Sequence, residues 1–311
     1  MSVASMYSDF ATREAHVASP TYERLSLAIS RDRELLTLLE RLPAPKRQPN
    51  LLLAVVRLLG GPVDDAGAFH DFVTANWSAV EAELRSRATQ TNEVGRCALL
   101  LPVLADLPQP LALLEVGAAA GLGLYPDRYS YRYGDHRIGS SGPVLDCALT
   151  GTTPPTRLPE IVWRAGLDLN PLDVTDPADL AWLEALIWPE QHNRRERLRA
   201  AAAIAAADPP TLIRGDLADD LAQLAAKAPV GATLVVFHTS VLYQVPVARR
   251  TLFLDAVRTL SGHWISVEAP DVVPFPGLPS APESTLHNVL ALDGRPLAWT
   301  RGHGQAMQWL T

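Results

Sequence analysis

The sequence predicts an α/β protein in which an N-terminal helical region precedes a doubly wound, mainly parallel sheet with a terminal antiparallel hairpin. In the first third of the chain, apolar residues recur at spacings of three and four, the period of amphipathic helices. After Pro108 and Pro110, short apolar runs alternate with helical stretches, a pattern typical of βαβ units. Near the C-terminus, Asp293-Gly294 separates two apolar segments, as a hairpin turn does.

The change of pattern near residue 108 predicts two parts, a helical region at 1–108 and a sheet domain at 109–311. Prolines and a Gly60-Gly61-Pro62 turn separate the expected helices of the first part, because both residue types end helices. These helices are expected at residues 22–29, 35–42, 51–59, 69–84 and from about Thr91 to Leu107.

In the second part, buried strands are expected at residues 111–115, 161–167, 211–214, 233–237 and 264–268. Helices are expected between them at 177–186, 194–207, 217–227 and 248–260, followed by a hairpin of 286–292 with 297–299 and a strand at 305–310. Tyr129, Tyr131 and Tyr133 alternate with polar residues, which predicts an antiparallel hairpin inserted at residues 125–150.

Composition excludes several classes of protein. With 48% apolar and 20% charged residues among 311, the chain can bury a core and is not a disordered protein. The net charge of 27 − 34 = −7 disfavours binding to nucleic acid. Two cysteines without CxxC spacing and scattered histidines without HExxH predict neither a disulfide scaffold nor a metal site. With no signal peptide or spanning segment recognised, we expect a cytoplasmic protein without membrane contact.

The most informative segment is LLEVGAAAGLG at residues 113–123, where an apolar strand ends in Glu115 and turns through small residues. Such a turn lets the backbone approach a ligand at the carboxyl edge of a parallel sheet. An acid at this point disfavours a pyrophosphate, which is also an anion, and suits a cationic ligand with an amino group. The alternative is that the small residues only allow tight packing of strand on helix.

Two nucleotide motifs are absent. A dinucleotide fingerprint needs glycines at its first, third and sixth positions, but Ala119 and Leu122 follow Gly117 at the third and sixth. No GK[ST] follows the turn, so the phosphate-binding P-loop is not present either. An NAD-dependent enzyme is therefore disfavoured.

The segment resembles motif I of the class I S-adenosylmethionine-dependent methyltransferases, which have a Rossmann-like fold. In that motif an acid followed by Gly-x-Gly-x-Gly surrounds the amino-acid half of the cofactor. Glu115, Gly117, Ala119 and Gly121 occupy these positions here, with alanine in place of the middle glycine. The resemblance extends loosely over residues 108–311. It implies an α/β fold and S-adenosylmethionine as cofactor.

The resemblance also implies two further acids in the cofactor site. An acid at the end of the second strand binds the ribose hydroxyls, and Asp168 stands at that place with Asp173 as a rival. The gap of 168 − 115 = 53 residues requires the tyrosine-rich hairpin to be an insertion. After the third strand, Asp216 or a neighbouring amide is placed to contact the adenine. As alternatives, Asp168 is a turn residue and Asp216 a helix N-cap.

The loop after the fourth strand, HTSVLY, faces the methyl donor in the same superfamily. His238 at the strand end is a candidate general base, since the ordinary pKa of histidine is about 6.5. Tyr243 is a candidate for stacking on or bonding to the substrate. A structural role for His238 is the alternative, and methyl transfer proceeds without a dedicated base when positioning suffices.

Other polar residues are candidates for the substrate. TQTNEVGR (89–96) precedes the first strand, so Asn92, Glu93 and Arg96 are expected beside the cofactor mouth, and Tyr131 of the insertion beside the acceptor. The alternative is that the residues of this segment cap a helix or form surface ion pairs. The arginines of 194–199 favour a solvated face over an anion site, and the RGHG loop at 301–304 needs no role beyond a turn.

The sequence therefore predicts methyl transfer from S-adenosylmethionine to a small molecule, without predicting the acceptor or the oligomeric state. The alternative is a non-catalytic protein that keeps a Rossmann-like fold and a ligand pocket. Over nearly its full length, through TQTNEVGR, EVGAAAGL, DRYSYRYG and WPEQ, the chain also resembles a bacterial family catalogued only as a domain of unknown function. That second resemblance implies no activity.

Overall fold

A computed structural model describes residues 2–90 and 92–310 of the chain. Internal contacts divide it into two units, which we describe separately. The helical unit is Met1–Thr91 with Thr175–Glu196, and the sheet unit is Asn92–Val174 with Arg197–Thr311. The helix expected before the first strand is a single turn at Val94–Arg96 that leads into α7 (Cys97–Asp106), and α7 belongs to the sheet unit, not to the helical part. Thr91, its expected start, lies outside the described residues.

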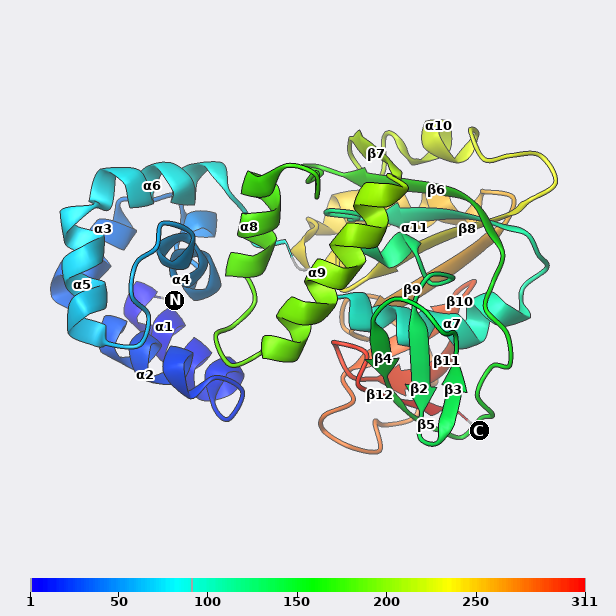
Figure 1. Cartoon of the computed structure of the whole chain (residues 1–311), viewed down its shortest axis with the longest axis horizontal. Helices are drawn as coiled ribbons and strands as arrows, with labels where there is room; N and C mark the ends of the chain where they lie inside the picture. The colour runs from blue at the N-terminus through cyan, green and yellow to red at the C-terminus, as the bar shows by residue number, and fades with distance from the viewer. Residues whose placement is uncertain (1, 91, 311) are drawn as a thin grey trace. The chain divides into compact units, whose positions relative to one another are not determined.

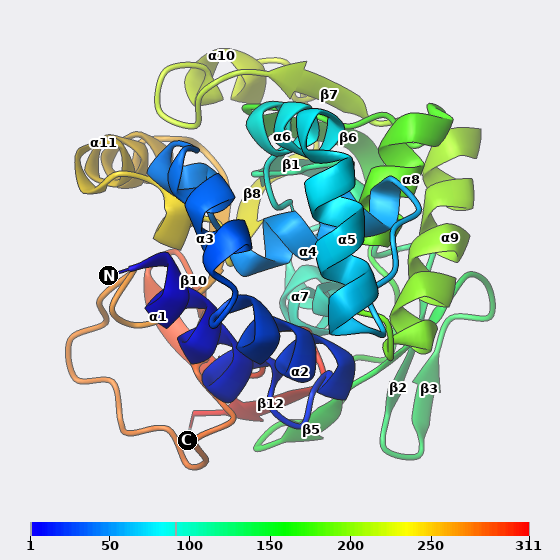
Figure 2. The ribbon, with the colours of Figure 1, turned by 90° about the vertical axis from the view of Figure 1, so that its left-hand side faces the viewer.

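The helical unit consists of short helices (Figure 2), several of which begin at a capping side chain. Ser19 Oγ accepts a hydrogen bond from the backbone N–H of Tyr22 at 3.2 Å, and Asp65 Oδ1 accepts one from Ala68 at 2.8 Å. The helix expected at 69–84 is two helices, because the chain turns at Asn76. The elements are α1 (Val3–Asp9), a π-helical turn (Phe10–Ala15), α2 (Pro20–Ile29), α3 (Arg33–Glu40), α4 (Pro49–Leu58), α5 (Ala66–Ala75), α6 (Trp77–Ser86) and α8 (Pro177–Ala185).

The segment after α8 joins this unit through side chains distant in sequence. The Arg57 guanidinium donates to the carbonyls of Ala185 and Ile187, and the Trp188 indole donates to Asn50 Oδ1 at 3.0 Å. These partners lie more than a hundred residues apart, so pattern alone could not assign α8 to the helical unit.

The sheet unit contains a nine-stranded sheet in which the five strands from β9 to the β7 edge are parallel (Figure 1). Its order is β5-β12-β11-β10-β9-β8-β1-β6-β7, and β10 to β12 form the terminal antiparallel part. The chain is thus a mixed α/β protein with a C-terminal hairpin, as predicted. The strands are β1 (Leu111–Val116), β5 (Ala148–Thr150), β6 (Ile161–Asp168), β7 (Thr211–Arg214), β8 (Thr233–Thr239), β9 (His263–Glu268), β10 (Asn288–Leu292), β11 (Arg295–Thr300) and β12 (Ala306–Trp309).

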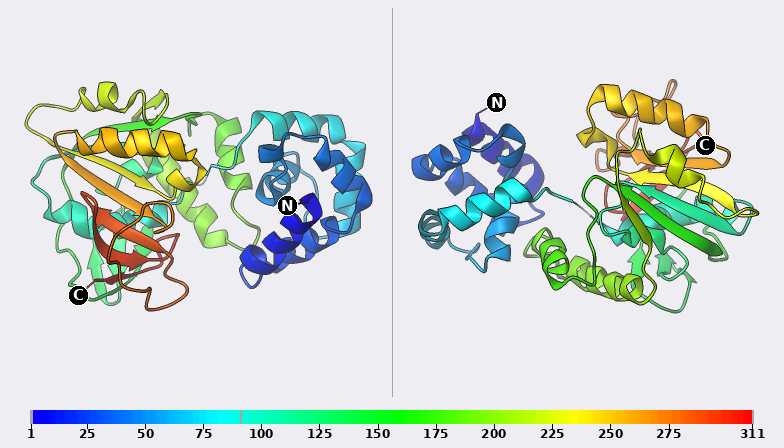
Figure 3. Two further views of the ribbon diagram at one scale, coloured as in Figure 1. Left: turned by 180° about the vertical axis from the view of Figure 1, so that it is seen from behind. Right: turned by 90° about the horizontal axis from the view of Figure 1, so that it is seen from above.

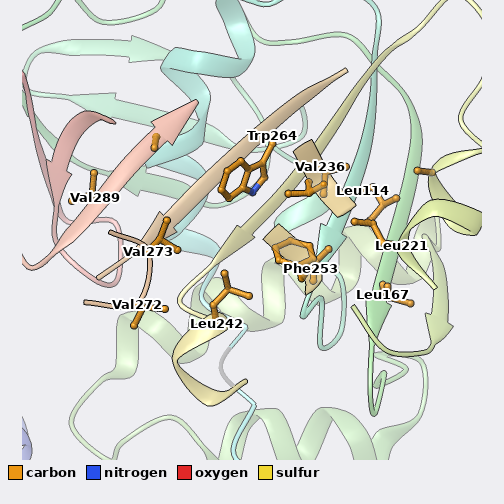
Figure 4. Packing of buried hydrophobic residues seen from close by; sticks show 14 of the residues in the cluster. Leu114, Leu167, Leu221, Val236, Leu242, Phe253, Trp264, Val272, Val273 and Val289 are labelled. Atoms are coloured by element: carbon orange, nitrogen blue, oxygen red, sulfur yellow. The ribbon is translucent and has the colours of Figure 1, made fainter. Parts of the chain in front are cut away.

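One face of this sheet packs against α10 (Leu221–Ala225) and α11 (Val247–Arg258), as Figures 3 and 4 show. Leu114 of β1 and Val236 of β8 meet Phe253 of α11 in a buried cluster. Because side chains alternate along a strand, Glu115 faces the opposite side of the sheet from Leu114. This alternation decides which helices surround each strand-end acid.

The tyrosine-rich insertion forms a three-stranded sheet of β2 (Ser130–Tyr133), β3 (His136–Ile138) and β4 (Val144–Asp146). Strands β2 and β3 are antiparallel, as predicted. The three tyrosine side chains are buried, and each hydroxyl donates to a backbone carbonyl: Tyr129 to Leu122, Tyr131 to Pro126 and Tyr133 to Ala98. The remaining long helix is α9 (His192–Ala207). Within the two described ranges, no helix has the length and apolarity to cross a membrane.

Candidate functional site at the carboxyl edge of the sheet

The bend after β1 is formed by residues in left-handed conformation. Gly117 has φ +70° and Gly121 φ +69°, and Ala119 between them has φ +49°. This region favours glycine, since a side chain there costs about 1–2 kcal/mol. Ala119 therefore adopts a backbone conformation that suits a glycine.

Asp168 at the end of β6 holds this bend in place. Its Oδ2 accepts the backbone N–H of Ala119 at 2.8 Å, and its Oδ1 accepts that of Asn170 at 2.7 Å. The N–H of Gly117 donates to the carbonyl of Leu167 at 2.8 Å. Asp168 therefore lies at the same edge of the sheet as Glu115, directly beside the bend, despite the 53 residues between them.

Asn92 closes the bend from the other side. Its Nδ2 donates to the carbonyl of Ala118 at 3.2 Å, and its Oδ1 accepts the N–H of Leu122 at 3.0 Å. The side chain expected to contact substrate thus connects the two ends of the turn. This contact places residues 92–96 at the carboxyl end of β1.

The Glu115 carboxyl group is buried under the bend, with 5% of the residue exposed. A Cβ atom at Gly123 would lie 2.5 Å from its Oε1, so a larger residue there would force the carboxyl group or the loop to shift. Oε2 is buried without a hydrogen-bond partner. Burial raises the pKa of this carboxyl group well above its ordinary value; the nearby Arg96 opposes the shift, and Asp168 adds to it.

Two neighbouring residues, Glu93 and Arg96, have well-defined partners. Glu93 Oε1 accepts the N–H of Gly95 at 2.9 Å and lies 3.4 Å from Arg197 Nη2. The Arg96 guanidinium donates to the carbonyl of Gly302 and to that of Thr239, each at 2.8 Å. Arg96 therefore brings a cation to the end of β8 and connects it with the RGHG loop.

A second bend follows β8, the strand beside β1. Ser240 has φ +53°, and its N–H donates to the carbonyl of Val267 at 2.8 Å. Its Oγ accepts a hydrogen bond from Asn288 Nδ2 at 3.0 Å. The two bends touch, since a side chain at Gly117 would meet the methyl groups of Val241 at 2.6 Å. Strained backbone of this kind gathers at functional sites.

His238 belongs to the core under this second bend. Its Nε2 accepts the indole N–H of Trp264 at 3.0 Å, so its Nδ1 carries the proton and donates to Glu268 Oε1 at 2.8 Å. His238 is 0% exposed and Glu268 1%. Both ring nitrogens of His238, the candidate general base, are thus engaged within the core.

The other candidates lie in different surroundings. Tyr243 is 61% exposed in the turn after Ser240. Tyr131, expected beside the acceptor, is buried, and its hydroxyl donates to the carbonyl of Pro126. Asp216 follows β7, where its Oδ1 accepts the N–H of Ala218 at 2.8 Å and pairs with Arg249. Burial is the largest single influence on the Asp216 carboxyl group and by itself would raise its pKa. The hydrogen bonds and the Arg249 charge together outweigh burial, so the pKa of Asp216 is lowered.

Sequence reasoning missed Glu268, Trp264, Ser240 and Asn288. Glu268 ends a predicted strand as Glu115 does, and this position was the one feature of the sequence that could have identified it. The left-handed turn at Ser240 has no glycine to mark it. Among the described residues, no group of histidine, cysteine, aspartate and glutamate side chains has the arrangement of a metal site.

These features define an α/β protein with two adjacent strained bends at the carboxyl edge of a mostly parallel sheet. The chain belongs to the family described as "Uncharacterized protein conserved in bacteria (DUF2332)", whose model matches residues 4–309. No curated protein and no solved structure matches it.

Proposed function

We propose that the sheet unit is a Rossmann-like, doubly wound domain that binds S-adenosylmethionine at this edge and directs its methyl group to a small molecule. The observation that carries the proposal is the position of the β1 bend in the strand order. Numbered along the chain, the five parallel strands lie in the order 3-2-1-4-5, the order of one Rossmann half and the beginning of the next. The order reverses between β1 and β8, and open sheets of this kind bind ligands there.

The two faces of the sheet support a doubly wound arrangement. Leu114 faces the cluster that contains α10 and α11. Glu115 faces the other way, next to Gly123, whose carbonyl accepts a hydrogen bond at 3.6 Å from the thiol of Cys97 at the start of α7. With α7 on this side and α10 and α11 on the other, the helices support the proposed doubly wound arrangement.

The residues present fit S-adenosylmethionine, whose ammonium and sulfonium groups are cationic. The buried Glu115 Oε2 lacks a donor, and Asp168 adds a second carboxylate at the same edge. Arg96 provides a cation that complements the carboxylate of the same ligand. Asp168 would bind the ribose, and the backbone of residues 215–217 would contact the adenine because Asp216 is paired with Arg249.

When bound, the cofactor supplies an activated methyl group, so the chain itself has to orient the acceptor and exclude water. Asn92 and Asp168 hold the β1 bend rigid, and Ser240 and Glu268 do the same for the β8 bend. Tyr243 remains the candidate for contact with the acceptor. A ligand that is cationic would also favour the ionised form of Glu115, so binding should release a proton.

Calorimetry on the full chain tests the proposal. We expect S-adenosylmethionine to bind the wild type and the variant Asp168→Asn to bind it at least about tenfold more weakly, a loss near 1.4 kcal/mol. Asp255→Asn, which removes an exposed carboxylate on α11, is the matched control and should bind as the wild type does. Equal losses in both variants, or no binding to the wild type, would contradict the proposal.

One observation favours the second candidate, a non-catalytic ligand-binding protein. His238, the expected base, is engaged at both nitrogens. Formation of S-adenosylhomocysteine with any member of a panel of small acceptors distinguishes the two. Binding without turnover across the panel supports the non-catalytic reading, and a preference for NADH over S-adenosylmethionine contradicts both.

A further inference from the structure

The sheet unit contains a hollow of about 510 Å³ that none of the assignments above uses. Its apolar lining includes Leu145, Cys147 and Ala148, at the junction of β4 with β5. Arg197 of α9 and His303 of the RGHG loop also line it. This volume lies within the range of pockets that bind small metabolites, about 300–1,000 Å³.

Positively charged or protonatable side chains outnumber acids in this hollow. Arg132, Arg197 and His303 line it, and Asp146 is the one carboxylate among its described lining residues. Arg132 and Asp146 form an ion pair with each other, on a part of the insertion that is open to solvent. The chain as a whole carries a net charge of −7, so this local excess of cations is opposite in sign to the overall charge.

Arg197 is the side chain in this hollow that most lacks acceptors. Its guanidinium has five N–H donors, and within the described residues its hydrogen bonding is limited to Nη2 with Glu93 Oε1, at 3.4 Å. Its Nε is buried without a partner. A buried donor without an acceptor is unfavourable, and a planar guanidinium is well suited to bind a carboxylate or phosphate.

We propose that this hollow binds a small organic anion, with Arg197 holding its carboxylate or phosphate group and the lining residues Leu145, Cys147 and Ala148 contacting its apolar part. His303, on the RGHG loop, adds a second donor. The hollow borders Gly95, and the next residue, Arg96, donates to the end of β8. It is nevertheless a separate site, because neither Glu115 nor Asp168 lines it.

The test is calorimetric titration of the full chain with succinate and, separately, with inorganic phosphate at low ionic strength, where charge interactions are least screened. We expect wild-type affinity in the millimolar range or better for at least one probe, and the stronger probe identifies the anionic group. Arg197→Gln should weaken binding by about tenfold, the loss of one charge-assisted contact. Arg199→Gln, an exposed arginine of the same helix, is the control and should bind as the wild type does.

Asp146→Asn should change the affinity for the anion in the opposite direction to Arg197→Gln. It removes the carboxylate from the hollow and releases Arg132 from its ion pair, so the anion should bind about two- to fivefold more tightly, as expected of an exposed charge pair. Partial unfolding cannot produce tighter binding. The proposal is overturned if neither probe binds the wild type, if Arg199→Gln loses as much as Arg197→Gln, or if Asp146→Asn weakens binding. S-adenosylmethionine is absent from this experiment, so its outcome is independent of the proposed function.

Discussion

The bends after β1 and β8 are built in the same way but are closed to different degrees. Gly117 and Ser240 are both left-handed, and the N–H of each donates at 2.8 Å to the neighbouring strand, to Leu167 and Val267 respectively. In both cases the next residue of that strand is an acid that accepts backbone N–H groups from the bend. The sheet therefore repeats the same arrangement, a left-handed bend held by the acid of the neighbouring strand, on either side of the point where its strand order reverses.

The two acids differ in what surrounds them. Asp168 is partly buried and holds Ala119 and Asn170. Glu268 is fully buried, and its Oε1 accepts hydrogen bonds from His238, Val241 and Leu242. A carboxylate open to solvent can exchange a water for a ligand, whereas one enclosed by three donors cannot. The comparison is consistent with the ligand site proposed at the β1 bend and with a structural role for the β8 bend.

Removal of the two acids should separate these roles most clearly. Glu268→Ala leaves three buried donors without an acceptor, and the free energy of unfolding should fall by about 3–5 kcal/mol. Asp168→Ala should cost about 1–2 kcal/mol, because water can reach the freed N–H groups. Urea unfolding of both variants measures the difference. Glu268→Gln, which keeps an acceptor oxygen, should lose less than Glu268→Ala; equal losses for the two acids would contradict the distinction.

Much of the sheet could be predicted because its signals are local. Strands β1 and β6 to β9 lie where apolar runs predicted them, and the alternation of Tyr129, Tyr131 and Tyr133 predicted the inserted hairpin. The same alternation could not show that Tyr131 would be buried with its hydroxyl bonded to Pro126. A period of two marks a shared face of a strand, but the packing of distant segments decides what covers that face.

The surroundings of the strand-end residues could be predicted only in part for the same reason. Glu115 and Asp168 were identified by their places after strands, and both lie at the candidate edge. His238 has an equivalent place, but its partners Glu268 and Trp264 lie 30 and 26 residues away in sequence. No local pattern separates an imidazole open to substrate from one enclosed by an indole and a carboxylate.

The pH dependence of stability should isolate the buried acid of the β1 bend. Burial raises the pKa of Glu115 far above its ordinary 4.5, so the folded chain keeps a proton that the unfolded chain loses. Stability from this group is therefore present at low pH and falls as pH rises from about 4.5 toward the folded pKa, by at most about 1.4 kcal/mol per pH unit.

Glu115→Gln is neutral at every pH and should lack this decline. Urea unfolding of the wild type and the variant between about pH 5 and pH 8 would show their difference in stability shrinking or reversing as pH rises. Parallel curves for the two proteins would mean that Glu115 is ionised in the folded chain, and the bend would then hold a permanent negative charge.

The smallest expected effect on stability comes from relieving backbone strain, and it should again differ between the two bends. Ala119→Gly relieves a left-handed alanine but loses a buried methyl group, and these changes offset each other to within about 1 kcal/mol. Ser240→Gly relieves similar strain, yet it also removes the acceptor of Asn288 Nδ2, a group that costs about 1–3 kcal/mol when it is left unpaired. Ser240→Gly should therefore unfold at lower urea concentration than Ala119→Gly. If the order were reversed, the Asn288 contact would contribute nothing, and the β8 bend would owe its shape to Glu268 alone.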